Sequence, residues 1–275
     1  MSGLIGSAEE KNPKWSVIYE KAITDSGEYY FPERLNKEFL DQAQRTLGSI
    51  LFANQYLNEI FPSDKAVFKR EWFKYTTELP AKLYTFAMID PAISTEDGAD
   101  YTGITVVSVD ADANWYFRLA KRDRLNSTQL LDLPFKLMEQ FNCNGIGIES
   151  VAFQKLYLSF VNVEMGKRKI VHLPLKEVKV PTDKTKEMRI MGALVPLFEW
   201  GRAYLTPGME DFEKELLQFP RSKFDDISDS AAHLKDLVFY PTKDERKLHE
   251  QPPPQSRDYE SYVIRQLSQR ANDEL

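Results

Sequence analysis

Residues 83–120 read LYTFAMIDPAISTEDGADYTGITVVSVDADANWYFRLA, and this stretch decides the fold class. The apolar run 83–89 ends directly at Asp90, and the β-rich runs 102–109 and 115–120 follow it. The letters DADAN join the second run to the third, which predicts an antiparallel hairpin. The stretch therefore predicts three successive strands, the first with an acidic residue at its end.

The chain beyond the hairpin alternates between helical and strand-like spacing of apolar residues. We expect helices over 127–141, 153–163, 183–200, 209–217 and 226–237, and strands over 144–150, 169–175 and 202–207. The helix over 183–200 is expected to turn five residues inward: Met188, Met191, Leu194, Val195 and Phe198. This order of elements predicts an α/β fold, a mixed sheet flanked by helices, with parallel strands after the hairpin.

The flanks differ from this core. Apolar residues at near-helical spacing predict one or two amphipathic helices within 36–57, and an irregular connector ends near Pro80. From Lys243 the sequence is polar and contains the run QPPPQ. We therefore expect an N-terminal helical connector (1–80), a core domain (81–240) and a C-terminal tail (241–275).

Composition narrows the classes of protein. Of 275 residues, 42% are hydrophobic, which is ordinary for a globular domain, and no apolar run approaches the ~20 residues of a membrane span. We expect no membrane partner. A single cysteine excludes an internal disulfide and a cysteine-rich zinc site. The net charge of −6 argues mildly against nucleic acid, but clustered carboxylates contribute to it and a local basic stripe can still contact phosphates.

Acidic residues stand where the predicted elements meet. Asp90 ends the first strand, Glu149 ends the fourth, and Asp225, Asp226 and Asp229 open the helix FDDISDSAAHLKDLVF. Neighbouring strand ends form a ligand-binding crevice in open sheets. An apolar stripe on that helix would seat it on the sheet and bring its aspartates near the strand ends.

Grouped carboxylates suit one chemistry in particular. Phosphodiester hydrolysis needs an activated water and charge stabilisation, which two divalent cations supply, and Mg²⁺ and Mn²⁺ prefer carboxylate oxygen. Each acid also has an ordinary interpretation: a turn at Asp90-Pro91, a helix cap at Glu149, and a dipole partner at Asp225 and Asp226. His233 is interpreted as a helix-surface or lining residue and not as a ligand.

The segments MIDPA around Asp90, GIGIES around Glu149 and FDDISDSAA around Asp226 resemble the nuclease domain of the large terminase subunit of tailed bacteriophages. Residues 30–75 resemble the connector that follows the packaging ATPase of that family, and 183–205 resemble the segment before its last acidic motif. The resemblance covers about 28–240.

The resemblance implies a ribonuclease-H-like fold and a site that binds Mg²⁺ or Mn²⁺, with two ions expected. Carried over, the catalytic and metal-binding residues are Asp90, Glu149 and Asp226, with Asp229 as an additional ligand or neighbour. Within the cluster, helical geometry favours Asp226 and Asp229 over Asp225. Many relatives begin the last motif with histidine, where Phe224 stands in this sequence.

The resemblance also implies partners. Large terminases contain a P-loop ATPase, but G-x-x-x-x-G-K-[ST] does not occur in this sequence. We therefore expect the nuclease portion of a longer protein, or the product of a split gene. Its expected partners are double-stranded DNA, a packaging ATPase domain or subunit, the small terminase and the portal. The expected location is the packaging motor in the cytoplasm of the infected bacterial host.

Basic residues near these motifs are interpreted as phosphate contacts. Lys184, Lys186 and Arg189 open the helix before the last acidic motif, and Lys121 and Arg122 belong to the run KRDR. Such contacts would add salt-dependent, sequence-tolerant affinity. A solvated helix face is the ordinary alternative.

Three functional hypotheses follow. The first is a metal-dependent endonuclease that cuts double-stranded viral DNA during genome packaging. The second keeps the site but changes the substrate, as in a junction resolvase, a transposase-like enzyme or a ribonuclease H. The third is a non-catalytic docking module for the portal or the small terminase.

Overall fold

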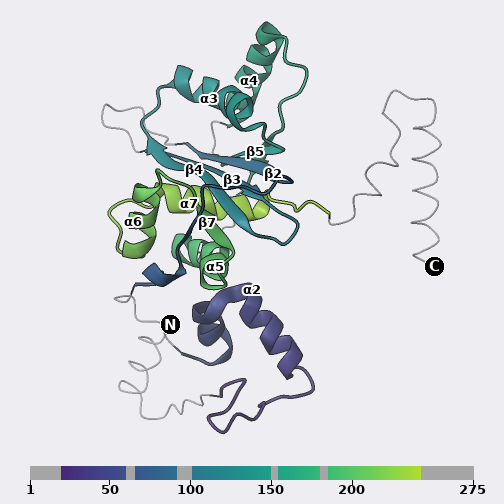
Figure 1. Cartoon of the computed structure of the whole chain (residues 1–275), viewed down its shortest axis with the longest axis vertical. Coiled ribbons are helices and arrows are strands. Elements are labelled where there is room, and N and C mark those ends of the chain that lie inside the picture. Colours follow the sequence, from purple (N-terminus) through teal and green to yellow (C-terminus); the bar gives the residue numbers. More distant parts are fainter. Residues whose placement is uncertain (1–19, 60–65, 92–100, 150–153, 180–184, 243–275) are drawn as a thin grey trace, which may run out of the picture.

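The computed structural model describes residues 20–59, 66–91, 101–149, 154–179 and 185–242. Its centre is a seven-stranded sheet of order β1-β7-β4-β3-β2-β5-β6 (Figure 1). The strands are β1 (Lys74–Tyr75), β2 (Tyr84–Asp90), β3 (Thr102–Val109), β4 (Trp115–Asp123), β5 (Gly145–Glu149), β6 (Leu175–Val178) and β7 (Ala203–Leu205). β3 runs antiparallel to β2 and β4, and the remaining neighbours pair in parallel. The order β4-β3-β2-β5-β6 is the ribonuclease-H-like order, so the predicted fold class is confirmed.

Helices cover both faces of the sheet (Figure 1). They are α2 (Lys37–Tyr56), α3 (Ser127–Phe141), α4 (Gln154–Arg168), α5 (Lys186–Glu199), α6 (Glu210–Gln218) and α7 (Asp226–His233). α3 and α4 lie on one face, and α5, α6 and α7 lie on the other (Figure 1). The buried apolar residues accordingly form two main cores, one on each side of the sheet.

Several boundaries follow the predicted local chemistry. The side chains and backbone amides of Asn126 and Gln129 form a reciprocal capping box at the start of α3, and Gly201 follows α5 with a φ of 62°. The amphipathic segment 36–57 forms α2, which consists of two helical parts joined by a kink at Gly48, whose φ is 75°. A Cβ on Gly48 would lie 2.9 Å from a methyl group of Val195, so this glycine allows α2 to lie close against α5.

Three predictions about elements are wrong. The strand predicted over 169–175 begins only at Leu175, because the chain first pairs with β5 at Pro174, whose carbonyl accepts the Ile146 amide at 2.8 Å. Proline has no amide to donate and therefore stands at the start of a strand. Val171, inside the predicted strand, is 98% exposed.

The second correction concerns α5 and the third concerns the connector. Within the described residues α5 begins at Lys186, and Met188 in its first turn is 40% exposed while Ile190 is fully buried.

The segment predicted as irregular contains β1, which extends the sheet beyond β7. Two residues are too few for any periodicity to reveal a strand.

The helix predicted over 226–237 changes at His233 into a 3₁₀ turn, Leu234–Asp236. In the described part of the chain, no helix combines the length and apolar character needed to cross a membrane. The domain boundaries at 80 and 240 stay predictions, and nearly all of the predicted tail lies outside the described residues.

Candidate active site

The alternation of side chains along β2 decides where Asp90 points. Phe86 and Met88 belong to the core beneath α5, α6 and α7, whereas Ala87 and Ile89 belong to the core beneath α3 and α4. Successive strand residues face opposite sides. Asp90 therefore lies on the side of the sheet that α7 covers.

Glu149 reaches the same place from the neighbouring strand. Ile146 and Ile148 of β5 belong to the α3–α4 core, so Glu149 points to the α7 side. β5 is parallel to β2, and Ile148 is in register with Ile89. One residue further along each strand, Glu149 and Asp90 are therefore neighbours on one face.

The side chains of Asp90 and Glu149 interact directly, and hydrogen bonding between them is one cause of the raised pKa of Asp90. Burial, this hydrogen bond, the charge of Glu149 and the charge of Asp229 together raise the pKa of Asp90 well above its usual range, while Lys186 opposes the shift. Two carboxylates in a desolvated site cannot both ionise cheaply. The pair is therefore a place where a cation, or a proton, would be stabilised.

Asp229 of α7 is the third acidic residue of this group. Its side chain is 6% exposed, and its two oxygens accept hydrogen bonds from Nη2 of Arg189 at 2.8 and 3.0 Å. Lys186 lies 3.2 Å from the same carboxylate. Two cations from α5 therefore neutralise Asp229 beside the Asp90–Glu149 pair.

A glycine allows α7 to approach the sheet at this point. Gly103 of β3 is paired in register with Asp90, and a Cβ on it would lie 2.2 Å from the carbonyl oxygen of Asp226. The hydroxyl of Ser230, one turn further along α7, donates to the carbonyl of Met88 at 3.2 Å. Gly103 is a site residue that sequence reasoning missed, although glycine within a strand often marks a close backbone approach.

The aspartates at the start of α7 have different surroundings. Asp225 forms an ion pair with Lys186 at 2.7 Å. Asp226 is half-buried; burial raises its pKa, and the charges of Lys186, Asp225 and Arg122 act on it. Asp229 is the aspartate of α7 whose charge acts most strongly on Asp90. The structure thus groups Asp90, Glu149 and Asp229, while the metal-binding assignment of all four predicted acids stays a prediction.

His233 lies beneath this group and is fully buried. Its Nε2 is 3.6 Å from Oδ1 of Asp229, and neither ring nitrogen has a hydrogen-bond partner among the described residues. Burial lowers its pKa, so the ring is neutral at neutral pH. Complete burial contradicts the helix-surface interpretation of His233 and leaves the interpretation as a lining residue.

Residues that were predicted to contact phosphate form ion pairs within the protein. Lys121 forms an ion pair with Asp123 at 3.1 Å, and Arg122 forms one with Glu215 at 2.6 Å. Glu215, which the sequence did not single out, is buried in α6 and also accepts the amide and hydroxyl of Ser228. Lys184 lies outside the described residues. Its role and those of Lys121, Arg122, Lys186 and Arg189 in DNA binding stay predictions.

The donor set can be compared with the needs of a divalent cation. Within the described ranges, no three Asp, Glu, His or Cys side chains are grouped so that they could hold a metal ion. Asp90 and Glu149 nevertheless provide a carboxylate pair of the kind that Mg²⁺ and Mn²⁺ prefer, and such ions keep several waters. The residues therefore fit a hard cation if Asp229 is released from Arg189 or water completes the shell.

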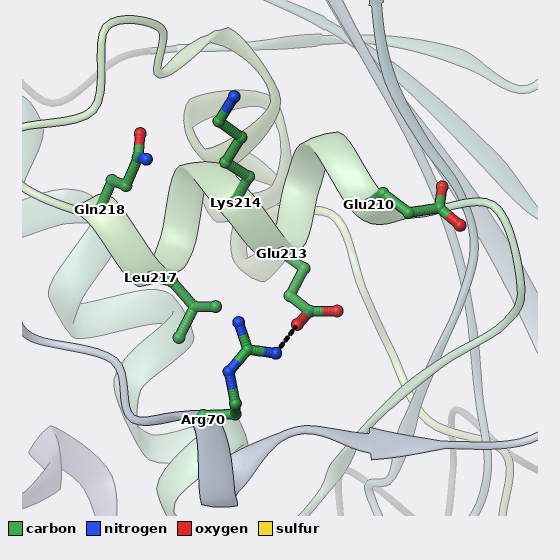
Figure 2. A pocket seen from close by; sticks show the side chains of 6 residues that line it. All are labelled: Arg70, Glu210, Glu213, Lys214, Leu217 and Gln218. Atoms are coloured by element: carbon green, nitrogen blue, oxygen red, sulfur yellow. Dashed lines mark hydrogen bonds and ion pairs between the residues drawn. The ribbon is translucent and has the colours of Figure 1, made fainter.

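A separate hollow of about 320 Å³ lies between α6 and the turn Arg70–Trp72, away from these acids. Figure 2 shows Arg70 reaching toward Glu213, with which it forms an ion pair at 2.8 Å. The hydroxyl of Tyr75 donates to the other oxygen of Glu213 at 2.7 Å. These contacts join β1 and its preceding turn to α6, and the hollow contains none of the predicted site residues.

Comparisons with known proteins give structural matches only. No protein-family model matches the sequence, and no curated protein matches it. The large terminase nuclease from thermophilic phage G20c with bound zinc is similar over 61% of this chain and 93% of its own, with 13% identity and a TM-score of 0.44.

Two further solved structures have lower TM-scores. The yeast mitochondrial Holliday junction resolvase matches 71% of this chain and 89% of its own, with 14% identity and a TM-score of 0.36. The Mn-soaked, inhibitor-bound human cytomegalovirus terminase nuclease domain matches 56% of this chain and 82% of its own, with 12% identity and a TM-score of 0.36. At these values the matches decide nothing about the reaction, and the fold assignment rests on the strand order.

Proposed function

We propose that this chain is a divalent-metal-dependent nuclease that hydrolyses phosphodiester bonds of double-stranded DNA. One observation carries the proposal: Asp90 and Glu149 lie side by side at the ends of β2 and β5, one residue beyond the register pair Ile89–Ile148, and the charge of Asp229 acts on Asp90 from α7. Burial makes this arrangement costly for a protein without a cation. Binding of Mg²⁺ or Mn²⁺ at these carboxylates would offset the electrostatic cost of burying them together, as expected of a metal-dependent hydrolase.

Asp90 and Glu149 would hold the cation, with Asp229 and Asp226 as further ligands or neighbours. When bound, one or two such ions would supply Lewis-acid stabilisation of the phosphate and lower the pKa of a bound water. Lys186 and Arg189 would neutralise the phosphate that enters beside them, because both already point at the acidic group. The neutral ring of His233 would exclude water from beneath Asp229.

We further propose that the substrate is viral DNA and the biological role is genome packaging. The support is the resemblance of 30–75 and 183–205, together with the three acidic motifs, to large terminase subunits. A packaging ATPase, the small terminase and the portal would be its partners, at the packaging motor in the infected bacterium. The N-terminal connector would contain the surface for the ATPase.

The experiment is a cleavage assay with Mn²⁺ or Mg²⁺ on linear duplex, plasmid, branched DNA and RNA–DNA hybrid. We expect metal-dependent cutting of duplex DNA by the wild type and cutting at background level by Asp90→Asn and Glu149→Gln. Asp110→Asn, an acid in the β3–β4 turn, serves as the control and should cut normally. Equal cutting by wild type and Asp90→Asn would refute the proposal, and preference for branched DNA or hybrid would replace the substrate.

A further inference from the structure

Two aromatic rings and an arginine are stacked beside the acidic group. The rings of Tyr101 and Phe224 meet edge to face, with centroids 5.4 Å apart. The guanidinium of Arg122 lies 4.3 Å from the centroid of Phe224 and 5.6 Å from that of Tyr101. Arg122 is also bound to Glu215 and its side chain is 16% exposed, so it serves as the fixed centre of this cluster.

Two exposed cations extend the cluster outward. Arg124 lies 4.7 Å from the centroid of Tyr101, and Lys223 lies 5.1 Å from that of Phe224. Both residues are exposed, and neither side chain forms an ion pair with any other described residue. The rings therefore hold two positive charges in place at the surface without neutralising them.

The sheet fixes the distance from this cluster to the acids. Asp90, Gly103 and Arg122 are successive register partners across β2, β3 and β4. Two strand spacings amount to about 10 Å, a length of helix axis over which one strand of a duplex carries about three phosphates. A strand whose phosphate lies at Asp90 would thus pass over the cluster a few nucleotides away.

We propose that Tyr101, Phe224, Arg122, Arg124 and Lys223 form a phosphate-binding platform for nucleic acid, in which the rings hold Arg124 and Lys223 ready for backbone contact. This inference deepens the proposed function and rests on it. A stacked guanidinium keeps its N–H fork free for phosphate oxygens. Side chains already held by rings lose less freedom on binding. The platform contacts the phosphate backbone and not the edges of the bases, so its binding does not depend on the base sequence.

The test measures binding of the full chain to a short labelled duplex by fluorescence anisotropy, in EDTA, over a series of salt concentrations. Each lost phosphate contact should reduce the slope of log K against log salt by about 0.9, which weakens binding about eightfold at 0.1 M salt. The double variant Arg124→Gln/Lys223→Gln should therefore bind roughly 60-fold more weakly, with a slope smaller by about 2. Tyr101→Leu should weaken binding less and keep the slope.

The matched control is Arg168→Gln. Arg168 also lies over a ring, 4.2 Å from the centroid of Phe135, but on the α3–α4 side and paired with Asp132. The control should leave the slope and the Kd unchanged. An unchanged slope in the double variant, no duplex binding by the wild type, or an unchanged Kd for Tyr101→Leu would overturn the inference.

The two proposals fail in different ways. Binding that shows the predicted loss of slope, without any metal-dependent cutting, would support the platform and refute the nuclease. Cutting by the wild type, with wild-type binding by the double variant, would refute the platform and leave the nuclease standing.

Discussion

Replacing Asp90 by asparagine should stabilise the metal-free protein while abolishing cutting. Burial and the neighbouring Glu149 raise the pKa of Asp90, so its ionised form opposes folding. The amide of asparagine has the same shape, carries no charge and can donate to the Glu149 carboxylate. The substitution therefore removes an electrostatic cost without leaving a cavity.

The magnitude follows from proton linkage. An acid with a raised pKa costs nothing below its ordinary pKa near 4, and each pH unit above that costs about 1.4 kcal/mol until the folded pKa is reached. At pH 7 the limit is about 4 kcal/mol. Because Glu149 shares the same environment and can relax, we expect a net gain of about 2 kcal/mol, or roughly 4–8 °C in Tm.

Thermal unfolding of both proteins in EDTA at pH 7 and at pH 4 measures this directly. Asp90→Asn should melt higher at pH 7, and most of the difference should be lost at pH 4, where the wild-type carboxyl is protonated in the folded state and about half protonated in the unfolded chain. With Mn²⁺ at about 100 times its Kd, the wild type should gain about 2.7 kcal/mol and the variant much less. A variant that melts at or below the wild-type temperature at pH 7 would refute the reasoning.

Asp110→Asn provides a control of opposite sign. Burial alone would raise the pKa of Asp110, but hydrogen bonds from Asn114, Tyr116 and the Asp112 amide lower it below its ordinary value. Its stabilisation is therefore present above about pH 4 and is lost as pH falls through the folded pKa. The substitution should cost about 1 kcal/mol at pH 7, with the difference from wild type shrinking in acid.

Three other substitutions, with Gly166→Ala as a matched control, test the packing at the acidic site and between α2 and α5. Gly103→Ala should destabilise by about 1–3 kcal/mol and suppress cutting, because α7 must move; Gly166→Ala, with open space around it, should change denaturation by less than about 1 kcal/mol. Arg189→Ala should cost about 1.5–3 kcal/mol, because Asp229 then keeps only Lys186 as a cationic partner, and Mn²⁺ should raise the free energy of unfolding by more than in wild type, as measured by denaturation with and without the ion. Gly48→Ala should cost about 1–3 kcal/mol in chemical denaturation yet keep the cutting rate per folded molecule. Equal behaviour of the two Gly→Ala variants at 103 and 166, or a smaller Mn²⁺ gain in Arg189→Ala, would count against this description.

The mixed character of the sheet and the places of Asp90 and Glu149 at strand ends were accessible from the sequence. Strong β-rich runs, a short polar turn and later helical spacing determine which strands are antiparallel and which are parallel. Once β2 and β5 are neighbours, period-two alternation places both acids on one face. Local patterns sufficed because each strand end is fixed by its own strand.

The arrangement on α7 was not accessible in the same way. Asp226 and Asp229 are three residues apart, so their side chains point about 60° apart around the helix axis. The rotation of α7 on the sheet, and the position of α5, decide which of them meets Arg189. That rotation depends on Gly103 and on tertiary packing, which no spacing within the helix reveals.

The error at β6 has a similar origin. The run KIVHLPL has the composition of a strand, but Ile170, two residues beyond the end of α4, instead donates its amide to the carbonyl of Met165 at 2.9 Å. Pro174 then sets where pairing with β5 begins. Composition alone does not distinguish a buried strand from an apolar helix end.

The most direct test of the metal-binding claim is an anomalous difference map from crystals of this protein soaked in Mn²⁺. We expect a peak in contact with the carboxylate oxygens of Asp90 and Glu149, with Asp229 turned toward it, and no peak in Asp90→Asn crystals. A map without a peak at these carboxylates, from crystals of wild-type protein soaked at saturating Mn²⁺, would contradict the central claim.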